Sequence, residues 1–246
     1  MSLGTFQENT PQLFNQGLFE VSSTQKHRLG TPRRLEDGRT FIYAKNGGTA
    51  LAAGKLTVAP TVVANHVNKS VGDAAAIGDR AVKVDLGSTA LTANQYKEGF
   101  LVINDATGEG HQYKVSGHAA ADADATDVKI NLYDAVRAAL VANTSEYSLL
   151  KHPYDSVVIS ATDQGDTPTG IPSMAVTADY YFWLQTWGVC PALADETLAV
   201  GQALTIGTGV AGAVEVMDLV GEPLVGYAIQ AGVDTEYRQI FLTIQP

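Results

Sequence analysis

The sequence is poor in several features that proteins use for stability or binding. It has one cysteine in 246 residues, so no disulfide can form within the chain, which is typical of synthesis in a reducing compartment. Only 17% of the residues are charged, and 16 lysines and arginines face 26 aspartates and glutamates. The resulting net charge of −10 disfavours direct binding to nucleic acid. No apolar run approaches the roughly 20 residues that cross a bilayer, and the first residues lack the basic and apolar regions of a secretory signal. We therefore expect no membrane partner.

The motifs that usually carry chemistry are also missing. The five histidines form no HxH or HExxH pattern and do not pair with the cysteine. Neither a glycine-rich phosphate loop nor a GxSxG elbow occurs. Cys190 precedes Pro191 in an apolar stretch, which is typical of a buried thiol. The sequence therefore predicts no catalytic residue, no metal site, no cofactor and no enzymatic activity.

The residues that are abundant favour β-structure. The chain is 45% hydrophobic and has 24 glycines, with many valines and threonines, a composition typical of short strands joined by tight turns. Several segments, such as 81–86 and 127–136, alternate apolar and polar residues. We predict a mainly β fold with little helix, built from two barrel- or sandwich-like units and an extended N-terminal arm.

A sequence pattern that occurs twice suggests how these units are arranged. An aromatic segment is followed by Leu-Ala-x-Gly at 51–54 and again at 198–201, and glycine allows the backbone to bend into the next strand. Because the two copies flank a run of about six expected strands, we predict an inserted β domain at 78–165. The surrounding β domain would then be discontinuous, comprising 36–77 and 166–246, and residues 1–35 would form the arm.

The arm combines aromatic and basic residues. Exposed aromatic side chains at a chain end need a surface to pack against, and clustered cations suit an acidic partner. The alternative is a solvated segment without a partner. The candidate partner-binding residues are Phe6, Phe14, Phe19, Lys26, Arg28, Arg33 and Arg34.

The most aromatic stretch of the chain is "DYYFWLQTWG", residues 179–188. Strand alternation would direct Tyr181 and Trp183 to one face and Phe182 to the other. Aromatic residues of this kind are typical of cores and subunit interfaces, so we predict a subunit interface at Tyr181, Trp183 and Trp187. They could instead bind carbohydrate, as in an adhesion module.

The C-terminal stretch provides a resemblance to a known family. "AVGQALTIG" precedes "AVEVMD" and then "GEPLVGYAIQAGVDTEYRQIFLTI", and this series resembles the terminal strands of tailed-phage capsid decoration (cement) proteins. "RTFIYAKNGGTALAAGKL" resembles the N-terminal part of the same domain. The resemblance covers about a third of the chain, and small decoration proteins lack residues 78–165. It implies a β-rich, usually homotrimeric protein that binds the major capsid protein on the outer surface of the virion after synthesis in the host cytoplasm. The alternative is a carbohydrate-binding or adhesion module of a phage head fibre or tail. A third possibility is a hydrolase, which would need a deep pocket with at least two acidic residues.

Overall fold

The computed structural model describes residues 14–246, and this part of the chain is almost entirely β-structure. The strands are β1 (Pro32–Arg34), β2 (Thr40–Lys45), β3 (Thr57–Val58), β4 (Lys69–Ser70), β5 (Ala81–Val84), β6 (Phe100–Asp105), β7 (Gln112–His118), β8 (Val128–Leu132), β9 (Glu146–Leu150), β10 (Val158–Ile159), β11 (Pro168–Pro172), β12 (Tyr181–Ala194), β13 (Ala203–Ile206), β14 (Ala213–Val216), β15 (Gly226–Ala228) and β16 (Tyr237–Thr243). One short 3-10 helix, η1 (Ala64–His66), accompanies them. The predicted mainly β fold with little helix is confirmed.

Strand β12 organises the larger, ten-stranded sheet. Its first half lies between β2 and β11, and its second half lies between β16 and β14. From β14 the pairing continues through β13, β15 and β16 and returns to β12, so these five strands close into a barrel. Closure leaves these strands no free edge, which protects them from pairing with another chain.

Alternate residues of the barrel strands fill its interior. Leu204, Val214, Ile240 and Leu242 are all buried there, and Cys190 lies among them. Burial raises the pKa of the Cys190 thiol to about 12, because the charged thiolate is poorly solvated in an apolar interior. Cys190 is therefore a buried core residue, as the sequence predicts, and a poor nucleophile.

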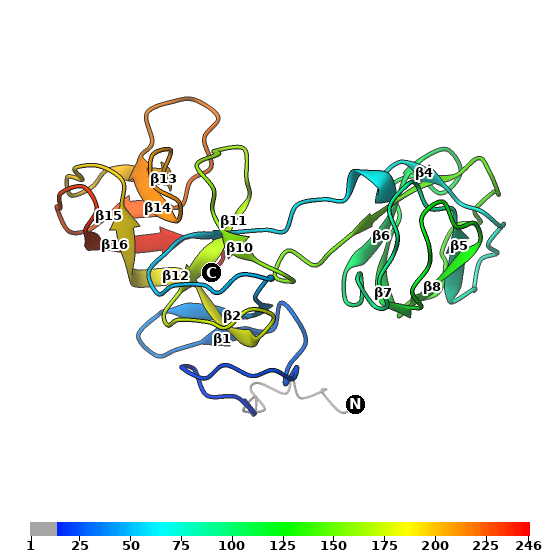
Figure 1. Cartoon of the computed structure of the whole chain (residues 1–246), viewed down its shortest axis with the longest axis horizontal. Coiled ribbons are helices and arrows are strands. Elements are labelled where there is room, and N and C mark those ends of the chain that lie inside the picture. The colour runs from blue at the N-terminus through cyan, green and yellow to red at the C-terminus, as the bar shows by residue number, and fades with distance from the viewer. Residues whose placement is uncertain (1–13) are drawn as a thin grey trace, which may run out of the picture.

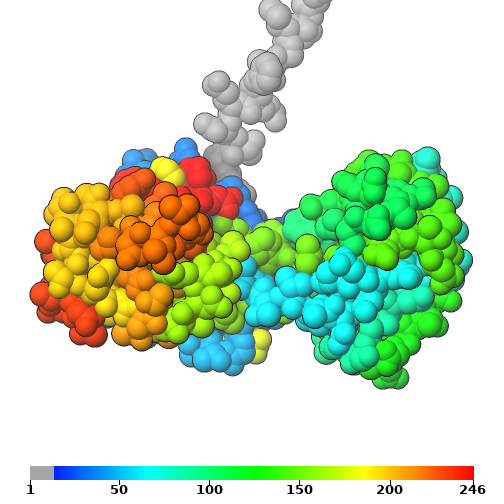
Figure 2. Space-filling model, turned by 90° about the horizontal axis from the view of Figure 1, so that it is seen from above, coloured from blue at the N-terminus to red at the C-terminus, as the bar shows by residue number. Residues whose placement is uncertain are grey.

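The second sheet has six strands in the order β4-β9-β6-β7-β8-β5. An antiparallel bridge between Val71 and Val84 joins its two ends, so the sheet curls around its own core. That core includes the buried aromatics Tyr96, Tyr113 and Tyr147. The chain leaves the larger sheet after β3 and returns to it with β10, and all strands of the second sheet lie between Lys69 and Leu150. Figures 1 and 2 show the two bodies side by side, joined by these two connections.

The two aromatic segments of the repeated sequence pattern are neighbours in the larger sheet. Strand β2 pairs antiparallel with the first half of β12, which places Tyr43 opposite Trp183 and Ala44 opposite Phe182. The predicted alternation is confirmed, because Trp183 and Tyr43 share one buried cluster, whereas Phe182 lies in another on the opposite face. The aromatic strands thus contribute buried apolar area on both faces.

Residues 14–31 lie against the larger sheet of their own chain. The buried side chain of Gln16 accepts a hydrogen bond from the Tyr43 hydroxyl and donates to the carbonyl oxygen of Tyr181. The Gln16 carbonyl oxygen in turn accepts from the Trp183 indole at 3.2 Å. Phe14 packs edge-on against Trp183, with ring centroids 5.2 Å apart. This segment therefore covers part of the aromatic core.

The same segment also contacts the second body. The Oε2 atom of Glu98 accepts hydrogen bonds from the Leu29 backbone N–H at 2.8 Å and from the Gln25 amide at 3.0 Å. The Arg28 guanidinium lies over the Tyr133 ring, 5.0 Å from its centroid. Residues 25–29 thus tie the second body to the first in addition to the two chain connections.

His152 lies at this junction and makes stability depend on pH. Its ring stacks on Phe100, and Nδ1 accepts the Tyr154 backbone N–H. Burial, and then the positive charge of Lys114, lower the pKa of His152 from 6.5 to about 4, against the opposing effect of Glu98. The unfolded chain therefore takes up the proton first, so this contribution is complete above pH 6.5 and is lost as the pH falls toward 4.

We expect denaturant unfolding to show lower stability at pH 4.5 than at pH 7, with His152 contributing at most about 3 kcal/mol. The substitution His152→Gln keeps a polar group of similar size and removes the titration. It should reduce the difference in unfolding free energy between the two pH values. An unchanged difference would show that His152 does not contribute.

Candidate functional site

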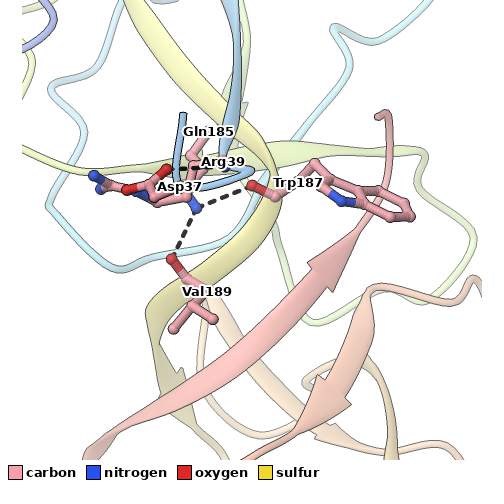
Figure 3. Close-up of polar contacts among 5 residues, drawn as sticks. All are labelled: Asp37, Arg39, Gln185, Trp187 and Val189. Atoms are coloured by element: carbon pink, nitrogen blue, oxygen red, sulfur yellow. Dashed lines mark hydrogen bonds and ion pairs between the residues drawn. The ribbon is translucent and has the colours of Figure 1, made fainter. Parts of the chain in front are cut away.

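A bulge in β12 shapes one part of the surface of the first body. The register between β2 and β12 shifts between Gln185 and Trp187, where β12 passes from β2 to β16. The buried Gln185 amide donates to the carbonyl oxygens of Trp187 at 3.1 Å and Val189 at 3.0 Å, as Figure 3 shows. Gly188 adopts a φ of +89°, which favours glycine, and a Cβ there would crowd the backbone of Arg39. The Gln185 hydrogen bonds and the backbone conformation of Gly188 therefore stabilise the bulge.

A groove of about 540 Å³ lies beside this bulge. One wall is the turn between β1 and β2, where the Asp37 carboxylate accepts hydrogen bonds from the Arg39 backbone N–H and guanidinium. These bonds hold the pKa of Asp37 below its usual value. The groove is lined by Asp37, Gly38, Arg39, Trp187, Gly188, Val189, Cys190, Pro191, Gln239 and Phe241.

The groove continues into an apolar outer face of the barrel. Val189 on β12, Phe241 on β16 and Tyr227 on β15 are direct partners across three neighbouring strands. Paired residues point to the same side of a sheet, and Val189 and Tyr227 are 40% and 43% exposed. Trp187, on the same strand as Val189, packs edge-on against Phe241. We call Trp187, Val189, Tyr227 and Phe241 the outer face.

The chemistry of this region suits binding to a protein surface. Aromatic and β-branched side chains supply apolar area, and the Asp37–Arg39 ion pair supplies a polar rim, the combination found at protein interfaces. Within residues 14–246, no group of three or more His, Cys, Asp or Glu side chains is arranged to hold a metal ion. No helix in the described residues is long and apolar enough to span a membrane.

The three aromatic residues predicted at a subunit interface lie in three different environments. Trp187 borders the groove and belongs to the outer face. Tyr181 is half-buried and stacks on Tyr43, with ring centroids 6.0 Å apart. Trp183 differs from the expectation, because it is 1% exposed and covered by Phe14 and Gln16 of its own chain. Its side chain is a core residue, so we do not propose it as an interface residue.

Of the arm residues predicted to bind a partner, some contact their own chain and others are exposed. Phe14 packs on Trp183, and the Arg33 guanidinium lies 4.6 Å from the centre of the Phe14 ring and donates to the Gln16 carbonyl oxygen. Phe14 and Arg33 are thus engaged within the chain. The exposed members are Phe19, Lys26, Arg28 and Arg34, and Phe6 lies outside the described residues.

The sequence reasoning missed most of the outer face. Alternation in "YRQIFLTI" does predict that the Phe241 side chain points to one side of the sheet and those of Ile240 and Leu242 to the other. It does not tell which of the two faces lines the barrel, because both carry large apolar residues. Pairing of β15 and β12 with β16, a long-range feature, places Tyr227 and Val189 beside Phe241.

Comparison with known proteins gives no relative: no family model, no curated protein and no solved structure matches this chain.

Proposed function

We propose that this protein is a non-enzymatic virion component that binds the outer surface of a phage capsid and stabilises it. The observation that carries the proposal is the outer face. Two of its members, Tyr227 and Phe241, lie on β15 and β16, the strands formed by the sequence that resembles decoration proteins. The C-terminal sequence that resembles decoration proteins therefore contributes to an exposed apolar surface on a closed barrel.

The partner of the outer face would be the major capsid protein. A contiguous exposed apolar patch on a folded protein marks an interaction site, and the groove beside it offers a recess for a protruding side chain. Repetition of one modest contact over a symmetric shell would give stable attachment without a large single interface. We include in the proposal the homotrimeric state that the resemblance implies. Light scattering of the purified chain, and of protein released from capsids, tests this state.

Charged substitutions in the outer face should abolish attachment. We expect Val189→Glu and Tyr227→Glu each to weaken co-sedimentation with purified expanded capsids of the encoding phage by at least tenfold, because an uncompensated carboxylate would be buried at the contact. Both side chains are exposed in the free protein, so thermal unfolding should change little. Capsid pelleting with quantified bound protein measures the effect.

Val158→Glu is the matched control. Val158 is 38% exposed and lies on β10, at the opposite end of the strand order from β16. This variant should pellet with capsids as the unaltered protein does. Equal binding by all three variants would remove the outer face from the proposal, and failure of the unaltered protein to bind any capsid would overturn the function.

A further inference from the structure

A polar pocket of about 300 Å³ lies where the two bodies meet. Its walls come from the N-terminal segment, from β2 and β12 of the first body, and from the turn before β6 of the second body. The lining residues are Gln25, Leu29, Lys45, Ala93, Asn94, Lys97, Glu98, Asp155 and Tyr181. Nothing in the proposed capsid contact uses this pocket.

Two largely buried carboxylates line the pocket. Glu98 is 5% exposed and Asp155 is 8% exposed. Both hydrogen bonds to the Glu98 carboxylate go to Oε2, and the Asp155 carboxylate accepts one, from the Ser156 hydroxyl to Oδ1. Glu98 Oε1 and Asp155 Oδ2 thus accept no hydrogen bond from the described residues. Each of these oxygens is therefore free to accept a hydrogen bond from a ligand in the pocket.

The charges around these carboxylates favour a neutral ligand. Lys45 and Lys97 balance Glu98 and Asp155, so the ionised lining has no net charge. Burial, reinforced by the nearby Glu98, raises the pKa of Asp155, and the positive charges of Lys151 and then Lys45 oppose the shift. A divalent cation would be repelled by the lysines, whereas a free ammonium group would compete with them for the carboxylates. A hydroxyl group both donates to a carboxylate and accepts from an ammonium.

Tyr181 completes the pocket with an aromatic wall. Its ring is half-buried and stacked on Tyr43, which fixes its orientation, and Lys45 Nζ lies 5.9 Å from its centre. An aromatic ring offers an apolar surface, while Asn94 and Gln25 add amide groups at the rim. Convergent polar groups beside one fixed apolar surface are the usual features of a small-molecule site.

We infer that this junction pocket binds a neutral polyhydroxylated ligand of the saccharide class. Ligand hydroxyls donate to Glu98 Oε1 and Asp155 Oδ2 and accept from the lysines, and the apolar face of the sugar ring packs against Tyr181. Because the walls come from both bodies, the bound ligand also holds the two bodies together. This inference does not depend on capsid binding.

The test uses the full chain and a panel of neutral disaccharides: maltose, lactose and sucrose. Saturation-transfer NMR and titration calorimetry measure binding to the unaltered protein and to Asp155→Asn and Glu98→Gln, which keep side-chain size and one acceptor oxygen. We expect at least one disaccharide to bind, and each variant to weaken its affinity at least tenfold, because a carboxylate is a stronger acceptor than an amide.

Asp195→Asn is the matched control, since Asp195 belongs to the barrel and lies outside the pocket. It should bind the disaccharide as the unaltered protein does. The inference is overturned if none of the sugars binds at 20 mM, if binding is equal in all variants, or if free amino acids bind and sugars do not. Capsid pelleting by Asp155→Asn should be unaffected, which separates this result from the outcome for the outer face.

Discussion

Replacing Trp183 with alanine is expected to lower the free energy of unfolding by about 4 kcal/mol, in the range observed for large aromatic residues removed from a core. The indole is fully buried between Phe14 and Tyr43, with ring centroids 5.2 and 5.0 Å away. Its N–H donates to the Gln16 carbonyl oxygen. Alanine therefore leaves a cavity and also removes the donor that holds the N-terminal segment.

Two measurements distinguish these effects. Denaturant unfolding gives the total loss of stability, and hydrogen exchange should show faster exchange of backbone amides in residues 14–31. Trp187→Ala is the control, because Trp187 is half-buried on the outside of the barrel. It should cost less than half as much stability and leave exchange in residues 14–31 unchanged. Equal losses of stability for the two variants would contradict the prediction that the buried Trp183 stabilises the protein more than Trp187 does.

This contact also determines how the N-terminal arm can be tested for capsid binding. A deletion of residues 1–35 removes Gln16 and Phe14 and also β1, which pairs with β2. It would expose Trp183 and destabilise the first body. Loss of attachment could then result either from the missing arm or from unfolding of the first body. Deletion of residues 1–13 keeps Phe14, Gln16 and β1 in the chain and is the appropriate variant.

The fold class and the alternation of single strands could be predicted from the sequence because they depend on neighbouring residues. Alternate residues of a strand face opposite sides, and "DYYFWLQTWG" separates Trp183 from Phe182 accordingly. Cys190 is a further example, since its apolar neighbours predict the burial that the barrel interior provides.

The sites could not be predicted in this way because they depend on contacts between distant parts of the chain. The outer face exists because β15 and β12 both pair with β16. The junction pocket needs Glu98 and Asp155 beside Tyr181, and these three residues come from separate regions of the sequence. Similarly, aromatic composition alone cannot distinguish the core residue Trp183 from the surface residue Trp187, because the covering residue, Gln16, is more than 160 positions away.

Substituting Gly226 with alanine should open the barrel. Gly226 begins β15 and pairs with Leu204 on β13 and with Leu242 on β16, so it lies between two neighbours that close the ring. A Cβ at this position would clash with the carbonyl oxygen of Phe241 and crowd the Leu242 backbone. Backbone atoms cannot move aside as a flexible side chain can, so β15 and β16 must separate.

We expect Gly226→Ala to cost about 3 kcal/mol of stability, at the upper end of the range for overpacked positions, and to weaken capsid attachment as well, because Tyr227 and Phe241 would no longer be aligned. Gly48→Ala provides the control: a Cβ there meets no atom within 4 Å, so its stability should stay within about 1 kcal/mol of the unaltered protein. Thermal unfolding and capsid pelleting measure both consequences. Loss of stability with full attachment would contradict the link between barrel closure and the outer face, because the binding surface would then persist without the pairing that forms it.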